Sequence, residues 1–174
     1  MIKIINSLDP FFNDCYRRIN VREYAKLQNI SPPTAANILN EYTKEGLLLK
    51  EKERQYHFFL ANKENWIFRD LCRIYWKRQL ERSNFLNQIE REYKCATIIL
   101  FGSLAKAEVS KNADIDIAIF SPSSEKGEYS AFESKIKRKI QIFKYANAEE
   151  IKSKELKKNI LSGYILTGAW HGLD

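Results

Sequence analysis

The sequence predicts an α+β fold in which an N-terminal helix-turn-helix unit, a long helical segment and a C-terminal mixed β-sheet with flanking helices follow one another. Residues 1–61 hold short helical patterns followed by two strand patterns. Residues 62–94 repeat apolar side chains at helical spacing without a Gly or Pro. Residues 95–174 open with two short apolar runs typical of buried strands. These ranges define the three parts that we expect.

The first part begins with three helical patterns. Residues 8–19 predict one helix, and Asn20 is placed to cap a second helix over residues 21–28. Ser31 is a good N-cap for a third helix, and it precedes two prolines, which are tolerated in the first turn of a helix. That third helix is expected to run to Glu45 and to end at Gly46. Two helices joined by a short turn form a helix-turn-helix.

Two strands are expected next, over residues 47–50 and 56–60, around a charged turn at residues 51–54. With this hairpin as the wing, the segment resembles winged helix-turn-helix domains of prokaryotic transcription factors. The resemblance implies binding to double-stranded DNA, with the helix that starts near Pro33 in the major groove. The residues implied in DNA contact are Thr34, Asn37, Glu41, Lys44 and, at the wing tip, Arg54. Winged helices also serve as dimerisation or protein-docking modules, so a homodimer stays open.

The second part predicts either one long helix or two helices that break at Ser83-Asn84. Beyond residue 121 we expect a flexible loop over residues 121–127 and a helix over 130–136. We then expect a strand over 138–144, one or two helices over 148–161 and a last strand over 165–167.

Composition bounds the function. A chain of 174 residues with 44% hydrophobic content is long enough for one ordinary domain or two small ones. No apolar run approaches the ~20 residues of a membrane span, and the N-terminus lacks the layout of a signal peptide. Three scattered cysteines without metal-type spacing suit a reducing cytoplasm. The net charge of +7 is spread along the chain, except for one basic cluster at residues 135–139. This cluster suits either phosphate binding or a solvated helix end.

The strongest functional signal lies around residue 100. Residues 95–101 and 113–120 predict two strands, and Gly102-Ser103 directly follow the first. Because side chains alternate along a strand, Asp114 and Asp116 share one face of the second. Two neighbouring carboxylates repel unless a cation lies between them, and Mg²⁺ prefers such oxygen ligands. Gly102 allows close approach of a ligand, and Ser103 can open a helix whose free N–H groups suit phosphate.

Gly-Ser, about ten residues and then Asp-x-Asp resembles the signature of the DNA polymerase β-type nucleotidyltransferase superfamily, in its minimal nucleotidyltransferase branch. The resemblance covers residues 95–167. It implies that Asp114 and Asp116 hold Mg²⁺ or Mn²⁺, while Gly102 and Ser103 meet the β and γ phosphates of ATP or another nucleoside triphosphate. Lys106 and Lys111 are the nearby lysines that could neutralise phosphate charge.

The sequence departs from this family at one position. The family usually carries a third carboxylate on the neighbouring strand, and Gln141 stands there. A neutral amide binds Mg²⁺ less well than a carboxylate and cannot accept a proton from an attacking hydroxyl. Glu125, Glu128 or Glu133 could substitute if the preceding loop folded inward. Because of this departure, the sequence leaves open whether the protein catalyses nucleotidyl transfer.

Three functions therefore remain. The first is a metal-dependent transferase that moves a nucleoside monophosphate to a macromolecular acceptor; related small proteins act as antitoxins that modify a helical toxin, which makes a protein acceptor plausible. The second is a transcriptional regulator whose degenerate transferase domain senses a nucleotide. The third is a non-enzymatic adaptor that uses both folds for assembly.

Overall fold

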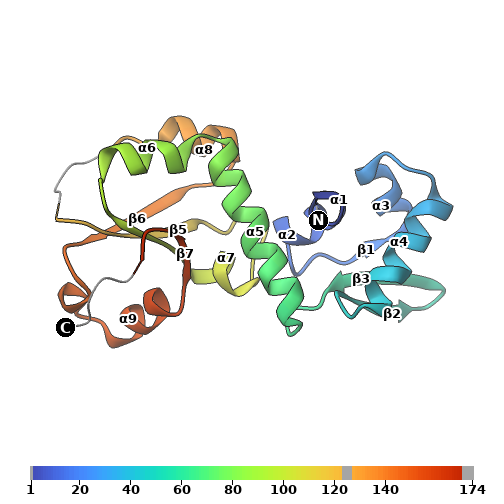
Figure 1. Ribbon diagram of the computed structural model, residues 1–174. Coiled ribbons are helices and arrows are strands. Elements are labelled where there is room, and N and C mark those ends of the chain that lie inside the picture. Colours follow the sequence, from blue (N-terminus) through green and yellow to red (C-terminus); the bar gives the residue numbers. More distant parts are fainter. Residues whose placement is uncertain (1, 123–126, 170–174) are drawn as a thin grey trace. The chain divides into compact units, whose positions relative to one another are not determined.

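The computed structural model describes residues 2–122 and 127–169, and the chain forms two compact units (Figure 1). One unit comprises Met1–Tyr75 and Ala107–Lys111, and the other comprises Trp76–Lys106 and Asn112–Asp174. The boundary falls inside helix α5 (Trp66–Arg82) and not at an end of the segment 62–94. No helix of the described residues has the length and apolar composition needed to cross a bilayer.

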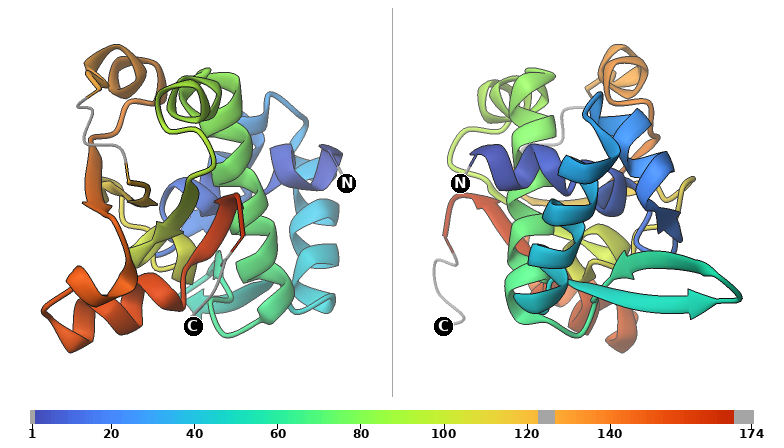
Figure 2. Two further views of the ribbon diagram at one scale, coloured as in Figure 1. Left: turned by 60° about the vertical axis from the view of Figure 1, so that its left-hand side comes forward. Right: turned by 90° about the vertical axis from the view of Figure 1, so that its right-hand side faces the viewer.

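The first unit packs short helices on a small antiparallel sheet. Its elements are α1 (Ile2–Ser7), α2 (Asp9–Asn13), β1 (Ile19–Asn20), α3 (Val21–Gln28), α4 (Pro32–Lys44), β2 (Leu48–Glu53) and β3 (Tyr56–Ala61). The strand order is β1-β3-β2, and the β2–β3 hairpin projects from the rest of the unit (Figure 2). The core contains large side chains from most of these elements, including Phe11, Phe12, Ile19, Tyr24, Leu39 and Phe59.

Local side-chain caps define α3 and α4, as the sequence predicted. The side chain of Asn20 accepts a hydrogen bond from the Glu23 backbone N–H at 3.0 Å. The Ser31 hydroxyl accepts one from the Thr34 N–H at 3.3 Å. Each cap satisfies a backbone donor that the first helical turn leaves without an intrahelical partner.

Two predictions in this unit were wrong in their bounds. The helix expected over residues 8–19 is interrupted, because Asp14 is extended (φ −153°) and Ile19 pairs with Phe59 in the sheet. The charged turn expected over residues 51–54 is shorter, because pairing continues to Glu53 opposite Tyr56. Arg18 forms ion pairs with Glu51 at 3.4 Å and with Glu53 at 2.8 Å, which offsets the charge on that strand.

The helical segment consists of two helices, which confirms one of the two alternatives. Helix α5 ends at Arg82 and α6 (Phe85–Glu92) follows after Ser83-Asn84. Asn84 is left-handed (φ +71°), a conformation that no residue inside a right-handed helix adopts. The buried Ser83 hydroxyl donates to the Leu80 carbonyl at 2.8 Å and accepts from the Phe85 N–H at 3.3 Å. These bonds satisfy backbone groups that the break exposes.

The second unit is a four-stranded mixed sheet with helices on both faces. It contains β4 (Thr97–Phe101), α7 (Gly102–Lys106), β5 (Ile115–Phe120), α8 (Ser130–Ile136), β6 (Ile140–Tyr145), a 3₁₀ turn (Ala148–Glu150), α9 (Lys154–Leu161) and β7 (Tyr164–Thr167). The order is β6-β5-β4-β7, with only β5 and β6 parallel. Helices α6 and α8 lie on one side and α9 lies on the other (Figures 1 and 2).

Strands β4, β5 and β6 each begin two residues later than expected, whereas β7 begins one residue earlier. Cys95 is left-handed (φ +58°), so β4 begins at Thr97 and not at residue 95. Asp114 directly precedes β5, whereas the prediction placed it inside the strand. The Ile115 N–H donates to the Lys139 carbonyl at 2.9 Å, and regular pairing with β6 starts there.

Candidate functional site

Three strands place polar side chains at one edge of the second unit's sheet. Gly102 and Ser103 open α7 directly after β4, Asp116 is the second residue of β5, and Gln141 is the second residue of β6. In the sheet register Phe101 is opposite Asp116, and Asp116 is opposite Gln141. Residues distant in sequence are therefore neighbours across adjacent strands.

Gly102 is held against one of the two carboxylates. Its φ is +70°, and a Cβ added to it would lie 2.2 Å from Oδ2 of Asp116. A side chain here would both strain the backbone and displace the carboxylate. The Asp116 side chain thus lies directly against the backbone at the start of α7.

The two carboxylates act on one another electrostatically. Burial raises the pKa of Asp116 above its usual value, and the charge of nearby Asp114 raises it further. Both causes disfavour the ionised form, so the folded protein without a cation holds Asp116 in an unfavourable state at neutral pH. A cation between the carboxylates would remove that penalty.

Gln141 binds directly to one of these two carboxylates. Its amide Nε2 donates a hydrogen bond to Oδ2 of Asp114 at 2.7 Å. The residue lies on the same face of the sheet as Asp116, as the predicted register requires. The amide orients one carboxylate, but it carries no charge and accepts no proton.

Two carboxylates and an amide are a small ligand set. Among residues 2–122 and 127–169, no group of three or more His, Cys, Asp and Glu side chains is placed to hold a metal ion. Mg²⁺ needs only one or two carboxylates when phosphates and water complete its shell. Asp114 and Asp116 therefore fit one such ion.

The alternative carboxylates differ in their placement. Glu133 is engaged elsewhere, because its Oε1 accepts a hydrogen bond from the Ile140 N–H at 2.8 Å. Glu128 is exposed and accepts one from the Ser130 hydroxyl at 3.3 Å. Glu125 lies outside the described residues. The structure thus places Gln141, and neither Glu128 nor Glu133, beside the aspartates.

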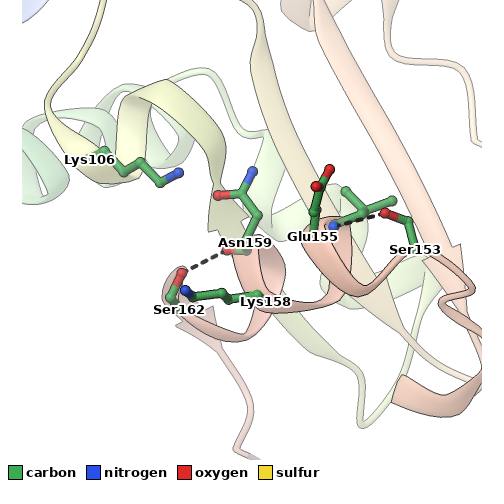
Figure 3. A pocket seen from close by; sticks show the side chains of 7 residues that line it. Lys106, Ser153, Glu155, Lys158, Asn159 and Ser162 are labelled. Atoms are coloured by element: carbon green, nitrogen blue, oxygen red, sulfur yellow. Dashed lines mark hydrogen bonds between the residues drawn. The ribbon is translucent and has the colours of Figure 1, made fainter.

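The two lysines singled out in the sequence occupy different settings. Lys106 is the last residue of α7 and is exposed. It lines a depression of about 680 Å³ together with residues of α9 (Figure 3). Lys111 is also exposed but belongs to the segment 107–111, which groups with the first unit.

Sequence reasoning missed the contribution of Arg138. Its guanidinium Nη1 donates to the Ala113 carbonyl at 2.6 Å, immediately before Asp114. The same guanidinium lies 4.8 Å from the centre of the buried Trp76 ring. Arg138 thereby anchors the backbone that enters the aspartate segment. Its place in the basic cluster 135–139 was the only signal for such a role.

The candidate DNA-contacting residues lie along one exposed side of α4. Thr34, Asn37, Glu41 and Lys44 are all exposed and recur every three or four residues, so they share a helical face. A shallow depression of about 620 Å³ is lined partly by Asn37, Glu41 and Lys44. Arg54 is exposed in the tight turn of the β2–β3 hairpin.

Comparison with known families supports a nucleotidyltransferase domain over residues 82–167. Residues 82–167 match the family model of the nucleotidyltransferase domain. The match supports the nucleotidyltransferase superfamily and contains all three strands that meet at the aspartates. No match was found among curated proteins or among solved structures.

Proposed function

We propose that the second unit binds a nucleoside triphosphate, such as ATP, together with Mg²⁺ or Mn²⁺ at Asp114 and Asp116. One observation carries the proposal: Gly102 lies against the Asp116 carboxylate, next to a second carboxylate. A close backbone approach beside paired carboxylates suits a ligand that brings both phosphate and a cation. The nucleotidyltransferase domain match supports the same ligand class.

The reaction that this site suits is transfer of a nucleoside monophosphate to a macromolecular acceptor, which we propose is a protein. An acceptor oxygen forms a bond to the α-phosphorus, and the bond to the bridging oxygen breaks as pyrophosphate leaves. A divalent cation, when bound, neutralises the charge on these phosphates. Asp114 and Asp116 hold that cation, Gly102 and Ser103 receive the β and γ phosphates, and Lys106 offsets their charge.

Gln141 limits the rate of this reaction. No carboxylate of β6 is available to take the proton of the attacking hydroxyl, so that proton passes to water. General-base assistance typically contributes ~10²- to 10⁴-fold. We therefore expect slow transfer or none. If no transfer occurs, binding of the nucleotide is still sufficient for a nucleotide-sensing role.

Substitution of Gln141 tests the proposal. Gln141→Asp is expected to strengthen metal-dependent ATP binding and to raise any pyrophosphate release, because it restores a third carboxylate. The double variant Asp114→Ala, Asp116→Ala is expected to lose metal-dependent binding. The measurement is ATP binding and pyrophosphate release at matched Mg²⁺, with Glu90→Gln on α6 as the control. Unchanged metal dependence in the double variant would show that the site is misassigned.

A second function is favoured by the order of elements in the first unit. The unit has two short helices, a strand, two further helices and a hairpin, with strand order β1-β3-β2. This order suits a winged helix-turn-helix. We propose that this unit binds double-stranded DNA through Thr34, Asn37, Glu41 and Lys44 of α4, with Arg54 on the adjacent phosphate backbone.

Binding to duplex DNA is expected to weaken steeply as salt rises. Asn37→Ala and Lys44→Ala are expected to reduce affinity by about tenfold each, because exposed contacts of this kind contribute roughly 1–3 kcal/mol. Neither variant should unfold the protein, since both side chains are exposed. The measurement is fluorescence anisotropy with the full chain at several salt concentrations. If no duplex binds at low salt, the first unit is a dimerisation or docking module instead.

A further inference from the structure

A depression between α7 and α9 adjoins the edge that carries Gly102 and Ser103. It is lined by Lys106 at the end of α7 and, among others, by Ser153, Glu155, Lys158, Asn159 and Ser162 around α9 (Figure 3). All of these residues belong to the second unit. Its volume of about 680 Å³ is large enough for a ligand group and not only for water.

The sheet places this depression close to the Gly-Ser turn. Helix α9 leads through Gly163 into β7, and Tyr164 of β7 pairs with Leu100 of β4. A Cβ added to Gly163 would lie 2.6 Å from the Leu100 carbonyl oxygen. The end of α9 is therefore packed on the last residues of β4, two positions before Gly102.

The side chains in this depression are suited to an anion. Lys106 and Lys158 are exposed lysines that bring two ammonium groups, against the single carboxylate of Glu155. The Ser162 hydroxyl donates to the Asn159 carbonyl at 3.2 Å, and the Ser153 hydroxyl accepts from the Leu156 N–H at 3.2 Å. These bonds fix the two ends of α9 that border the depression.

Asn159 is the residue that indicates an unfilled interaction. Its side-chain Oδ1 is buried and has no hydrogen-bond partner, which is unusual for a buried polar atom. In Figure 3 the tips of Asn159 and Lys106 point toward one another across the depression. An ammonium group has three N–H donors. One donor of Lys106 can satisfy Oδ1 of Asn159 while the other two face a ligand.

We propose that Lys106, Lys158 and Asn159 form a binding site for the terminal phosphates of a polyphosphate. The polyphosphate is the triphosphate tail of the nucleotide or the pyrophosphate that leaves, and in its nucleotide form this inference rests on the proposed function. Lys106 and Lys158 bind the phosphate oxygens, and Asn159 holds the Lys106 ammonium in place. The site lets the protein distinguish a nucleoside triphosphate from a monophosphate.

Calorimetric titration of the full chain with three probes tests this inference: ATP, AMP and inorganic pyrophosphate, each with Mg²⁺. Lys158→Gln is expected to weaken ATP and pyrophosphate binding by about tenfold, the effect of one partly exposed charge-assisted hydrogen bond. AMP binding is expected to stay within about twofold. Asn159→Leu is expected to weaken ATP and pyrophosphate binding less, because it acts only through Lys106. Lys157→Gln on the same helix is the matched control, since Lys157 does not line the depression.

The outcomes separate this inference from the proposed function. If Lys158→Gln leaves the ratio of ATP to AMP affinity unchanged, the phosphate site is not at α9, whatever happens at the aspartates. Wild-type binding of pyrophosphate that depends on Lys158, without any ATP binding, would support the phosphate site and overturn the nucleotide assignment. If neither ATP nor pyrophosphate bound to the wild type, both the phosphate site and the nucleotide assignment would be overturned.

Discussion

On α4 the side chains proposed to contact DNA stand exposed and separate, whereas at the sheet edge of the second unit the candidate residues contact one another. Gly102 lies against Asp116, and Gln141 donates a hydrogen bond to Asp114. Substitution of Asn37, Glu41 or Lys44 should therefore change binding without changing stability. Thr34 differs, because its hydroxyl bonds to that of the Ser31 cap at 2.8 Å. A substitution at the sheet edge should change both, because each residue there supports another.

Two glycines with left-handed backbone, one in each region, show this contrast most clearly. Gly102 (φ +70°) and Gly46 (φ +71°) adopt the same conformation, one at the sheet edge and one after α4. A Cβ at Gly102 would meet Asp116 Oδ2 at 2.2 Å, whereas one at Gly46 would meet only Nδ2 of Asn65, at 3.3 Å. Both glycines adopt the same left-handed backbone conformation, but an added Cβ would overlap a neighbouring side chain only at Gly102.

The largest effect is expected for Gly102→Ala. The left-handed conformation costs an alanine roughly 1–2 kcal/mol at either glycine. At Gly102 the displaced carboxylate adds on the order of 1–3 kcal/mol, the range typical of overpacking. Gly102→Ala should thus lower the free energy of unfolding more than Gly46→Ala, and only Gly102→Ala should weaken metal-dependent nucleotide binding. Denaturant unfolding of both variants measures the difference; equal losses would mean that Gly102 is needed for its backbone alone.

A smaller effect, of opposite sign, is expected for Asp116→Asn without divalent cations. Burial and Asp114 raise the pKa of Asp116 in the folded protein above its unfolded value of 3.8. The folded state then binds the proton more tightly, so stability falls as the pH rises from about 3.8 through the raised pKa, and it stays lower at neutral pH. The amide cannot ionise, so Asp116→Asn should be more stable than the wild type at neutral pH. Asp116 is only partly buried, so screening by solvent keeps this gain small.

Unfolding in EDTA between acidic and neutral pH checks this sign, with Glu90→Gln as a control for the loss of one exposed negative charge. Adding Mg²⁺ and ATP should reverse the order, because only the wild type retains both metal ligands. A wild type that gains stability as the pH rises through this window would contradict the assigned cause.

The features that the sequence predicted correctly are mostly local. The caps at Asn20 and Ser31 bond to N–H groups three residues away, so their pattern is visible in a short window. Alternation along two apolar strands gave the faces of Asp116 and Gln141, and the family resemblance placed the two strands side by side, as the register shows. The caps and the faces depend on short stretches of sequence and not on distant contacts.

The features that were missed depend on pairing between distant segments. Ile19 leaves its predicted helix because Phe59, forty residues later, is its partner in the sheet. Arg138 anchors Ala113 from the segment between α8 and β6, and Asn159 faces Lys106 from another helix. No local pattern marks an arginine that binds a backbone carbonyl or an asparagine whose side-chain oxygen has no hydrogen-bond partner. Such contacts are set by the fold and become visible only in it.

The smallest effect is expected at the tip of the β2–β3 hairpin. Arg54 adopts a left-handed conformation (φ +54°) and is exposed. Arg54→Gly removes that backbone penalty but adds freedom to the unfolded chain, so a net gain of about 0.5 kcal/mol is expected. The neighbouring Gln55 is not left-handed, and Gln55→Gly should instead lower stability slightly.

The same Arg54→Gly variant should weaken DNA binding, because a phosphate contact is lost. The slope of log affinity against log salt should decrease by about one unit, as expected for a single phosphate contact. Thus Gly102→Ala should reduce stability and binding together, whereas Arg54→Gly should raise stability while it reduces binding. If Arg54→Gly changed both in the same direction, the hairpin tip would resemble the sheet edge, and the contrast between the two regions would not hold.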